Sequence, residues 1–135
     1  MTETMVGKRE FLIEYSMLTG ASAQDLVQVA IMYDQSLPVA QTALRSMPSI
    51  GFMSNSKRLA AFFSVCRHLE NLVLRGHCDA TQAIFSLALL RKSSSDFRKC
   101  IDLFDSMAPR IGLVERSSMS RIARDYLASV ERDLT

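Results

Sequence analysis

Residues 57–75 read KRLAAFFSVCRHLENLVLR and form the longest amphipathic stretch of the chain. Apolar residues recur in this stretch at spacings of 3, 4, 3 and 4, which keeps them on one face of an α-helix. They are Leu59, Phe62, Cys66, Leu69 and Val73. Phe63, Val65 and Leu72 widen this face into a broad apolar stripe. A stripe this wide needs partners on more than one side, so we expect the other helices to pack around 57–75.

The ends of this helix carry recognisable signals. Ser54 or Asn55 can cap its start, because a short side-chain oxygen accepts hydrogen bonds from the free N–H groups of the first turn. Gly76 suits the left-handed residue just past the end, and no Gly or Pro interrupts the stretch. The pattern therefore predicts a central helix over 57–75.

Helical spacing also predicts shorter helices before and after this stretch. They cover 8–19, 23–33, 36–47 and 80–91, one that carries Phe97 to Met107, and a last one that starts at Ser117 or Ser118. The whole chain has only 5 Gly and 3 Pro, and no long stretch alternates with a period of two. The sequence therefore predicts an all-α fold, a single-domain helical bundle of about six to seven helices packed around the central helix.

Length and composition indicate one soluble domain. A chain of 135 residues is the size of a single core, so we expect a domain over 8–135 that follows a flexible tail over 1–7. Lys8, Arg9 and Glu10 interrupt the N-terminus before any secretory signal, and no apolar stretch approaches the length of a membrane span. Together with an odd number of cysteines, three, these features favour a reducing, cytoplasmic location without membrane contact.

An alternative hypothesis is that residues 23–47 form a DNA-binding element. Two predicted helices are separated there by a three-residue break, 34–36, which is the spacing of a helix-turn-helix. Gln41, Thr42 and Arg45 would face the DNA. However, the first fifty residues carry 3 basic and 5 acidic groups, whereas DNA affinity rests largely on Lys and Arg. We therefore interpret 23–47 first as an ordinary helical hairpin, and only second as the DNA-binding element of a transcriptional regulator.

The chain shows no assembled catalytic or metal-binding pattern. His77 and Cys78 are adjacent, and no second Cys or His pair lies at metal-ligand spacing. The Gly-rich phosphate and dinucleotide motifs and H-E-x-x-H are absent. We therefore expect a protein that is not an enzyme and that uses no cofactor or metal.

A basic cluster surrounds the serine-rich break that precedes Phe97. Its members are Arg91, Lys92, Arg98 and Lys99. Residues 51–100 carry 8 basic and 3 acidic groups, so the cluster lies in the most positive part of the chain. It is either a solvated face around an exposed turn or a basic strip that meets an acidic partner.

An apolar loop and several methionines suggest a binding surface. Ile50, Phe52 and Met53 lie between predicted helices, and Met47, Met107 and Met119 lie near helix ends. Methionine adapts to irregular shapes, so these residues either fill gaps in the core or form an exposed apolar patch that docks a partner helix or peptide.

We therefore expect a non-enzymatic protein-binding module, a small cytoplasmic adaptor, chaperone-like protein or regulator. It would bind another protein or peptide through this apolar patch and the basic strip. Association into a homodimer is a further expectation, because a wide stripe in a small domain leaves apolar area to cover. Nucleic acid is the second choice of partner.

Overall fold

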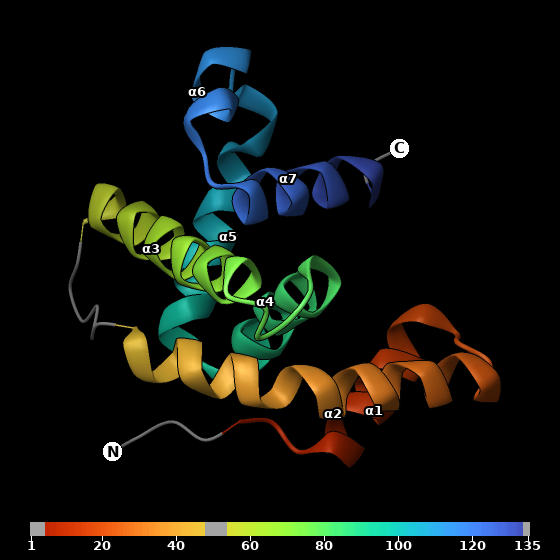
Figure 1. Cartoon of the computed structure of the whole chain (residues 1–135). Coiled ribbons are helices and arrows are strands. Elements are labelled where there is room, and N and C mark those ends of the chain that lie inside the picture. The colour runs from red at the N-terminus through yellow and green to blue at the C-terminus, as the bar shows by residue number, and fades with distance from the viewer. Residues whose placement is uncertain (1–4, 48–53, 134–135) are drawn as a thin grey trace.

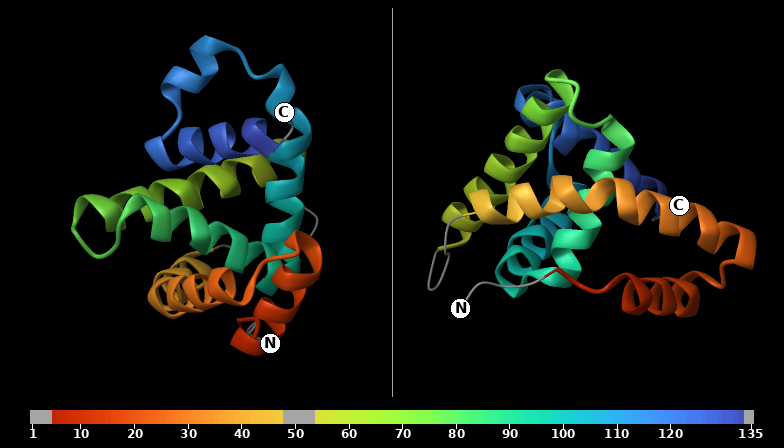
Figure 2. Two further views of the ribbon diagram at one scale, coloured as in Figure 1. Left: turned by 90° about the vertical axis from the view of Figure 1, so that its right-hand side faces the viewer. Right: turned by 60° about the horizontal axis from the view of Figure 1, so that its bottom comes forward.

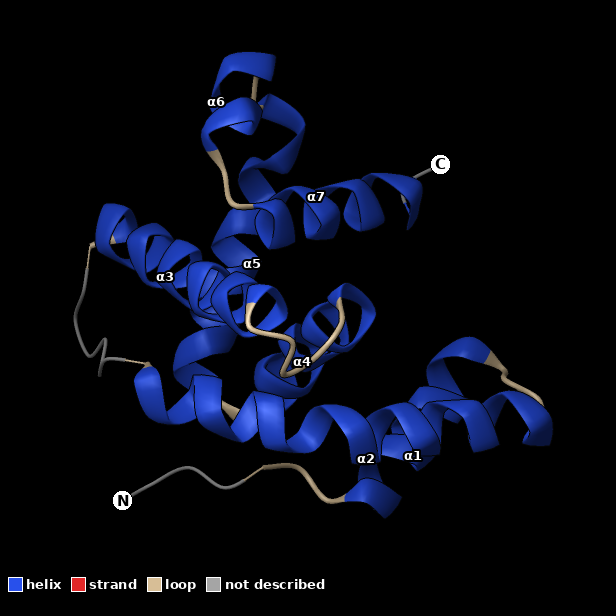
Figure 3. Ribbon diagram, viewed as in Figure 1, coloured by secondary structure: helices blue, strands red, loops and turns tan. Residues whose placement is uncertain are grey.

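The computed structural model describes residues 5–47 and 54–133. These residues form helices and connecting loops without any strand (Figures 1 and 3). In chain order the helices are α1 (Lys8–Thr19), α2 (Ala23–Ser46), α3 (Asn55–Leu74), α4 (Ala80–Ser93), α5 (Ser95–Met107), the single 3₁₀ turn η1 (Ala108–Arg110), α6 (Leu113–Ser118) and α7 (Arg121–Asp133). The predicted all-α helical bundle is confirmed.

Helix α3 is the element that the sequence placed at the centre, and it packs against α2, α4, α5 and α7. Its apolar stripe is buried at Phe62, Cys66 and Leu69, and Ser54 caps its start by accepting a hydrogen bond from the Lys57 N–H. Gly76 adopts the predicted left-handed conformation after its end, with a φ of 77°. In the view of Figure 1, α3 crosses the middle of the molecule, in front of α5 and beside α4.

Helix α4 shares the centre with α3, because it packs against α2, α3, α5 and α7. Ala83, Leu87, Leu89 and Leu90 are fully buried, as the nearly continuous apolar sequence of this helix predicts. The helix starts with a capping box in which Asp79 and the residue three positions later, Gln82, each accept from the other's backbone N–H.

The predicted break at 34–36 is wrong, because α2 runs without interruption from Ala23 to Ser46. Tyr33, Ser36 and Val39 are buried, and α2 has its most extensive contact with α4. Packing against α4 thus favours a continuous helix over the local turn signal of residues 34–36 and over Pro38 inside the helix. Residues 23–47 therefore do not form a helix-turn-helix.

The α1–α2 hairpin extends beyond the body of the molecule (Figure 2, right). Ser22 and Asp25 form a capping box at the start of α2, and Gly20 adopts the left-handed conformation after the end of α1. The helical spacing of apolar residues in 23–33 also predicts Val27 and Ile31 for the core, but both are exposed. The expectation is wrong for these two because they lie on the side of α2 opposite to the residues that pack on the core.

Residues 5 and 6 are anchored to the body although they belong to the predicted tail. Met5 and Val6 pack against the core, the Val6 N–H donates to Ser93 Oγ at 2.8 Å, and the Val6 carbonyl accepts from the Tyr33 hydroxyl. Residues 1–4 lie outside the described residues.

The last helix begins at Arg121 rather than at Ser117 or Ser118. The Arg121 N–H donates to a Glu70 carboxylate oxygen at 2.5 Å, and Ser120 Oγ accepts from the Ala123 N–H. These bonds satisfy free backbone groups of the first turn and so fix the start of α7. The residues just before it form the separate helix α6, which stands away from the rest of the molecule (Figure 1).

Candidate functional site

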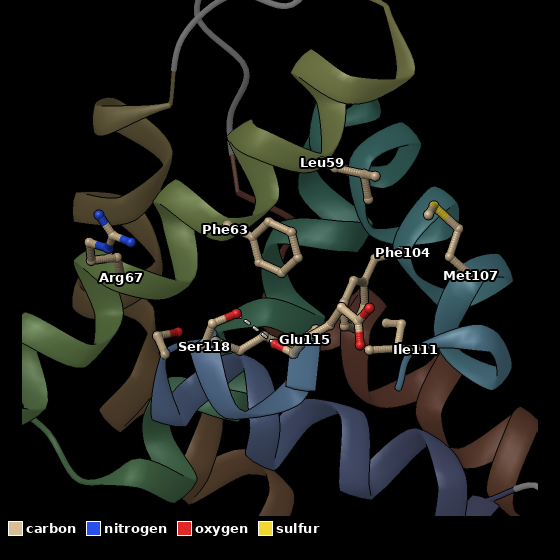
Figure 4. A pocket seen from close by; sticks show the side chains of 10 residues that line it. Leu59, Phe63, Arg67, Phe104, Met107, Ile111, Glu115 and Ser118 are labelled. Atoms are coloured by element: carbon tan, nitrogen blue, oxygen red, sulfur yellow. Dashed lines mark hydrogen bonds between the residues drawn. The ribbon is translucent and has the colours of Figure 1, made fainter. Parts of the chain in front are cut away.

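An apolar pocket of about 360 Å³ lies between α3, α5 and the connection 111–120 that leads to α7 (Figure 4). Its lining residues come from α3, the C-terminal end of α5 and the segment 111–120. They are Leu59, Phe63, Arg67, Phe104, Met107, Ile111, Glu115, Ser118, Met119 and Ser120. The pocket is thus built by elements from the middle and the end of the chain.

The inner wall of the pocket is an aromatic cluster. Phe104 stacks on the fully buried Phe62, with ring centroids 4.4 Å apart, and meets Phe63 edge-on at 5.7 Å. Because Phe62 and Phe104 are held in the core, this wall is in place before any ligand arrives. A preformed apolar wall is typical of binding pockets.

The roof of the pocket is the segment 111–120, and it is attached mainly at its two ends. Ile111 and Met119 pack against the core, whereas α6 between them has no buried residue. Arg116 supports this segment, because its Nε donates to the Ile111 carbonyl at 3.1 Å and its guanidinium pairs with Glu131 of α7. The roof thus has fewer core contacts than the aromatic wall.

Two opposite charges lie among the pocket's lining residues, Arg67 on α3 and Glu115 on α6 (Figure 4). Within 5–47 and 54–133 neither of them forms an ion pair. The Glu115 carboxylate instead folds back over Gly112, where an added Cβ would lie 2.7 Å from Oε2. An apolar pocket with one unpaired cation and one unpaired anion can hold a ligand that is apolar and carries charges at its edges.

The roof also carries apolar side chains that point away from the core. Leu113 and Val114 are 84% and 80% exposed. Both residues lie in the same segment that lines the apolar pocket.

The predicted apolar patch is partly placed by the structure. Met107 and Met119 both line the pocket, whereas Met47 packs against the core as gap filler. Ile50, Phe52 and Met53 lie outside the described residues.

The predicted basic strip is not a row of free charges. Arg91 pairs with Asp102 at 2.7 Å, and Lys92 pairs with Glu14 while its Nζ lies 5.8 Å from the centre of the Phe11 ring. Such pairs lower the charge that a partner meets.

Three members of the strip nevertheless lie together. Arg91, Lys92 and Arg98 line a second groove, of about 510 Å³, that is bounded by α1, α4, α5 and α7. Arg98 Nε donates to the Arg91 carbonyl across this groove's edge at 3.1 Å. The exposed Lys99 is not among its lining residues.

The described residues show no arrangement of metal ligands, since no three His, Cys, Asp or Glu side chains among them gather at one point. His77 is exposed, and Cys78 next to it is half-buried. All three cysteines are free, and burial raises the pKa of each thiol, most strongly that of Cys66. A raised pKa makes a thiol a weak nucleophile at neutral pH.

Sequence reasoning missed Arg67 and Glu115 as site residues, and also the exposed pair Leu113 and Val114. Arg67 was given no role, although it follows Leu59 and Phe63 at helical spacings of eight and four residues. A usable signal existed for the pair, because the short stretch between Pro109 and Ser117 holds three large apolar residues, Ile111, Leu113 and Val114. The connection contains only the six-residue helix α6, so apolar residues in it indicate either packing on the core or contact with a partner.

Comparisons with known proteins add no relative: no family model matches this chain, and no curated protein or solved structure matches it either. None of the helices in 5–47 and 54–133 has both the length and the apolar character needed to cross a bilayer.

Proposed function

We propose that this chain acts by binding another protein, whose apolar side chains enter the pocket between α3, α5 and 111–120. The observation that carries the proposal is the pocket itself, an opening of about 360 Å³ with a preformed aromatic wall. A protein of this kind would serve as an adaptor or regulator of its partner and would not catalyse a reaction. Its three free cysteines suit the reducing cytoplasm, where we place it.

The chemistry of the lining favours a protein segment as the ligand. Met107 and Met119 can adjust to side chains of different shape, and the aromatic wall supplies a large apolar contact. An amphipathic helix that presents apolar residues at spacings of three and four would fill such a pocket in the way helices fill grooves. Arg67 and Glu115 would then meet polar residues at the edges of that helix.

The experiment is a selection from a displayed library of amphipathic helical peptides, followed by measurement of the affinity of the selected peptides by fluorescence anisotropy. We expect Met107→Lys to weaken binding about tenfold or more, because it places a charge in an apolar contact. Met107 is only 39% exposed and lines the pocket.

Met17→Lys is the matched control, because Met17 is exposed on α1 and is not a lining residue. It should leave the affinity unchanged, and circular dichroism should show that both variants stay folded. The proposal would be overturned if no peptide were selected, or if both substitutions weakened binding equally.

A further inference from the structure

We propose that the partner in the pocket is a second copy of this chain, which inserts Leu113 and Val114 of its α6 while its own pocket receives the same two residues of the first copy. The inference rests on the proposed function, because it names the occupant of the same pocket. It requires that the molecule carry both a projection and a recess that fit each other.

The projection is the outer side of α6. Leu113 and Val114 stand next to each other on a helix that extends away from the body (Figure 1). Both are at least 80% exposed, and no described residue covers them. Covering them would remove two large apolar side chains from water, which is favourable in proportion to the area buried.

The recess lies directly beside this projection. The segment 111–120 carries Leu113 and Val114 outside while Glu115, Ser118 and Met119 of the same segment line the pocket. In a two-fold symmetric dimer, each contact between a residue i and a residue j of the other copy occurs twice. A two-fold axis beside α6 therefore lets one segment supply the inserted residues and part of the receiving pocket in both copies at once.

The pocket also carries one charge of each sign, which a second copy can pair. Arg67 and Glu115 lie on different elements, and neither forms an ion pair with a described residue of its own chain. If Arg67 of one copy faces Glu115 of the other, the symmetry creates two ion pairs and leaves no charge of this pocket unpaired. This complementarity favours a second copy over a partner of arbitrary sequence.

The test is the mass of the full chain in solution, measured by sedimentation equilibrium from about 1 to 200 µM, a range that covers interfaces of modest size. We expect a monomer–dimer equilibrium. Leu113→Asp combined with Val114→Asp should raise the dissociation constant about tenfold or more. Leu74→Asp, which changes an exposed leucine on α3 outside the pocket, should not change it.

A charge exchange makes the test specific for the proposed geometry. Arg67→Glu alone and Glu115→Arg alone should each weaken the dimer about tenfold, because each places like charges opposite one another. The double variant Arg67→Glu with Glu115→Arg should restore the dissociation constant to within about threefold of the parent. Circular dichroism confirms that each variant is folded.

Several results would overturn the inference. A parent that stays monomeric at 200 µM would do so, and so would a dimer that is indifferent to the Leu113 and Val114 changes or a double variant that stays as weak as the singles. If the monomeric parent binds selected peptides in a Met107-dependent manner, this inference fails and the proposed function stands. A dimer that depends on Leu113 and Val114 but whose pocket selects no peptide would support the second copy as the occupant of the pocket and would overturn the helix of another protein as its ligand.

Discussion

Asp105 and Tyr126 show how one hydrogen bond joins two helices behind the pocket. The Tyr126 hydroxyl of α7 donates to Asp105 Oδ1 of α5 at 2.6 Å. Burial raises the pKa of Asp105, while the hydrogen bond from Tyr126 and the nearby Arg91 lower it and so offset part of that rise. Burial and the same carboxylate raise the pKa of Tyr126, so its hydroxyl keeps its proton.

The raised pKa of Asp105 sets the sign of its effect on stability. The folded protein binds this proton more readily than the unfolded chain does. The contribution of Asp105 to stability is therefore fully present below the unfolded pKa, near 4, and is lost as the pH rises through the raised folded pKa.

Tyr126→Phe should destabilise the protein more at neutral than at acidic pH, because the hydrogen bond from Tyr126 lowers the pKa of Asp105 and so favours its charged form. At pH 7 it removes a hydrogen bond to a charged carboxylate, which is worth about 1.5–3 kcal/mol, and it raises the pKa of Asp105 further. Near pH 3 the carboxyl is neutral, so the cost should fall to about 1 kcal/mol. Urea unfolding at the two pH values measures both numbers.

Tyr15→Phe provides the control for this experiment, because the hydrogen bond described for Tyr15 uses its backbone carbonyl, which accepts from the Thr19 hydroxyl, and is kept in the variant. Its effect on unfolding should be small and the same at both pH values. An equal cost of Tyr126→Phe at pH 7 and pH 3 would contradict the assigned hydrogen bond.

Helix α2 shows how packing decides the length of a single element. Pro38 has no N–H to donate within the helix, and a proline in a helix interior usually kinks or breaks it. Yet Tyr33 and Ser36 before it and Val39 after it are all buried, and the Ser36 carbonyl accepts from Ser86 Oγ of α4. Pro38 itself is exposed, so its ring lies on the side where no neighbour is needed.

Pro38→Ala should therefore stabilise the protein. Alanine is about 3 kcal/mol more favourable than proline in a helix interior. The unfolded chain of the alanine variant is more flexible, which reduces this gain by about 0.4–1 kcal/mol. We therefore expect a net gain of about 2 kcal/mol in the free energy of unfolding, measured by urea denaturation.

Gln41→Ala, at another exposed position on the same helix, should change the free energy of unfolding by less than about 0.5 kcal/mol. A loss of stability in Pro38→Ala would show instead that α2 needs the proline to follow the surface of α4.

The molecule as a whole is built around two neighbouring helices, α3 and α4, and not around α3 alone. Each of them contacts α2, α5 and α7 as well as the other. Phe62 of α3 is the clearest link in this arrangement, because it is fully buried and contacts Phe97 and Phe104 of α5 and Tyr126 of α7.

Phe62→Asp should therefore unfold the whole domain. Loss of a buried phenylalanine costs about 3–5 kcal/mol, and an unpaired buried charge adds to that, against a total stability of about 5–15 kcal/mol for an ordinary domain. Far-UV circular dichroism should show the loss of helix or of a sharp thermal transition.

Leu74→Asp serves as the control on the same helix, because Leu74 is 75% exposed. It should keep the parent's transition within a few degrees. A sharp transition of Phe62→Asp near that of the parent would contradict the central position of α3.

Local signals in the sequence were enough to predict most helices and their ends. The spacing around Phe62 predicted α3 and its buried face, and Ser54 and Gly76 each marked an end of that helix that the structure has. Such signals succeed because a helix face repeats within one or two turns, and a cap acts on the first or last turn only.

The continuity of α2 and the pocket were decided only by tertiary structure. The break at 34–36 was a sound local prediction, but burial of α2 against α4 outweighed it. Leu59 and Met119 both line the pocket, but they are so far apart in the sequence that no local pattern relates them. The sequence therefore specified which residues form helices. The packing of those helices specified which apolar side chains stay exposed beside an open pocket, because burial depends on neighbours that are remote in the chain.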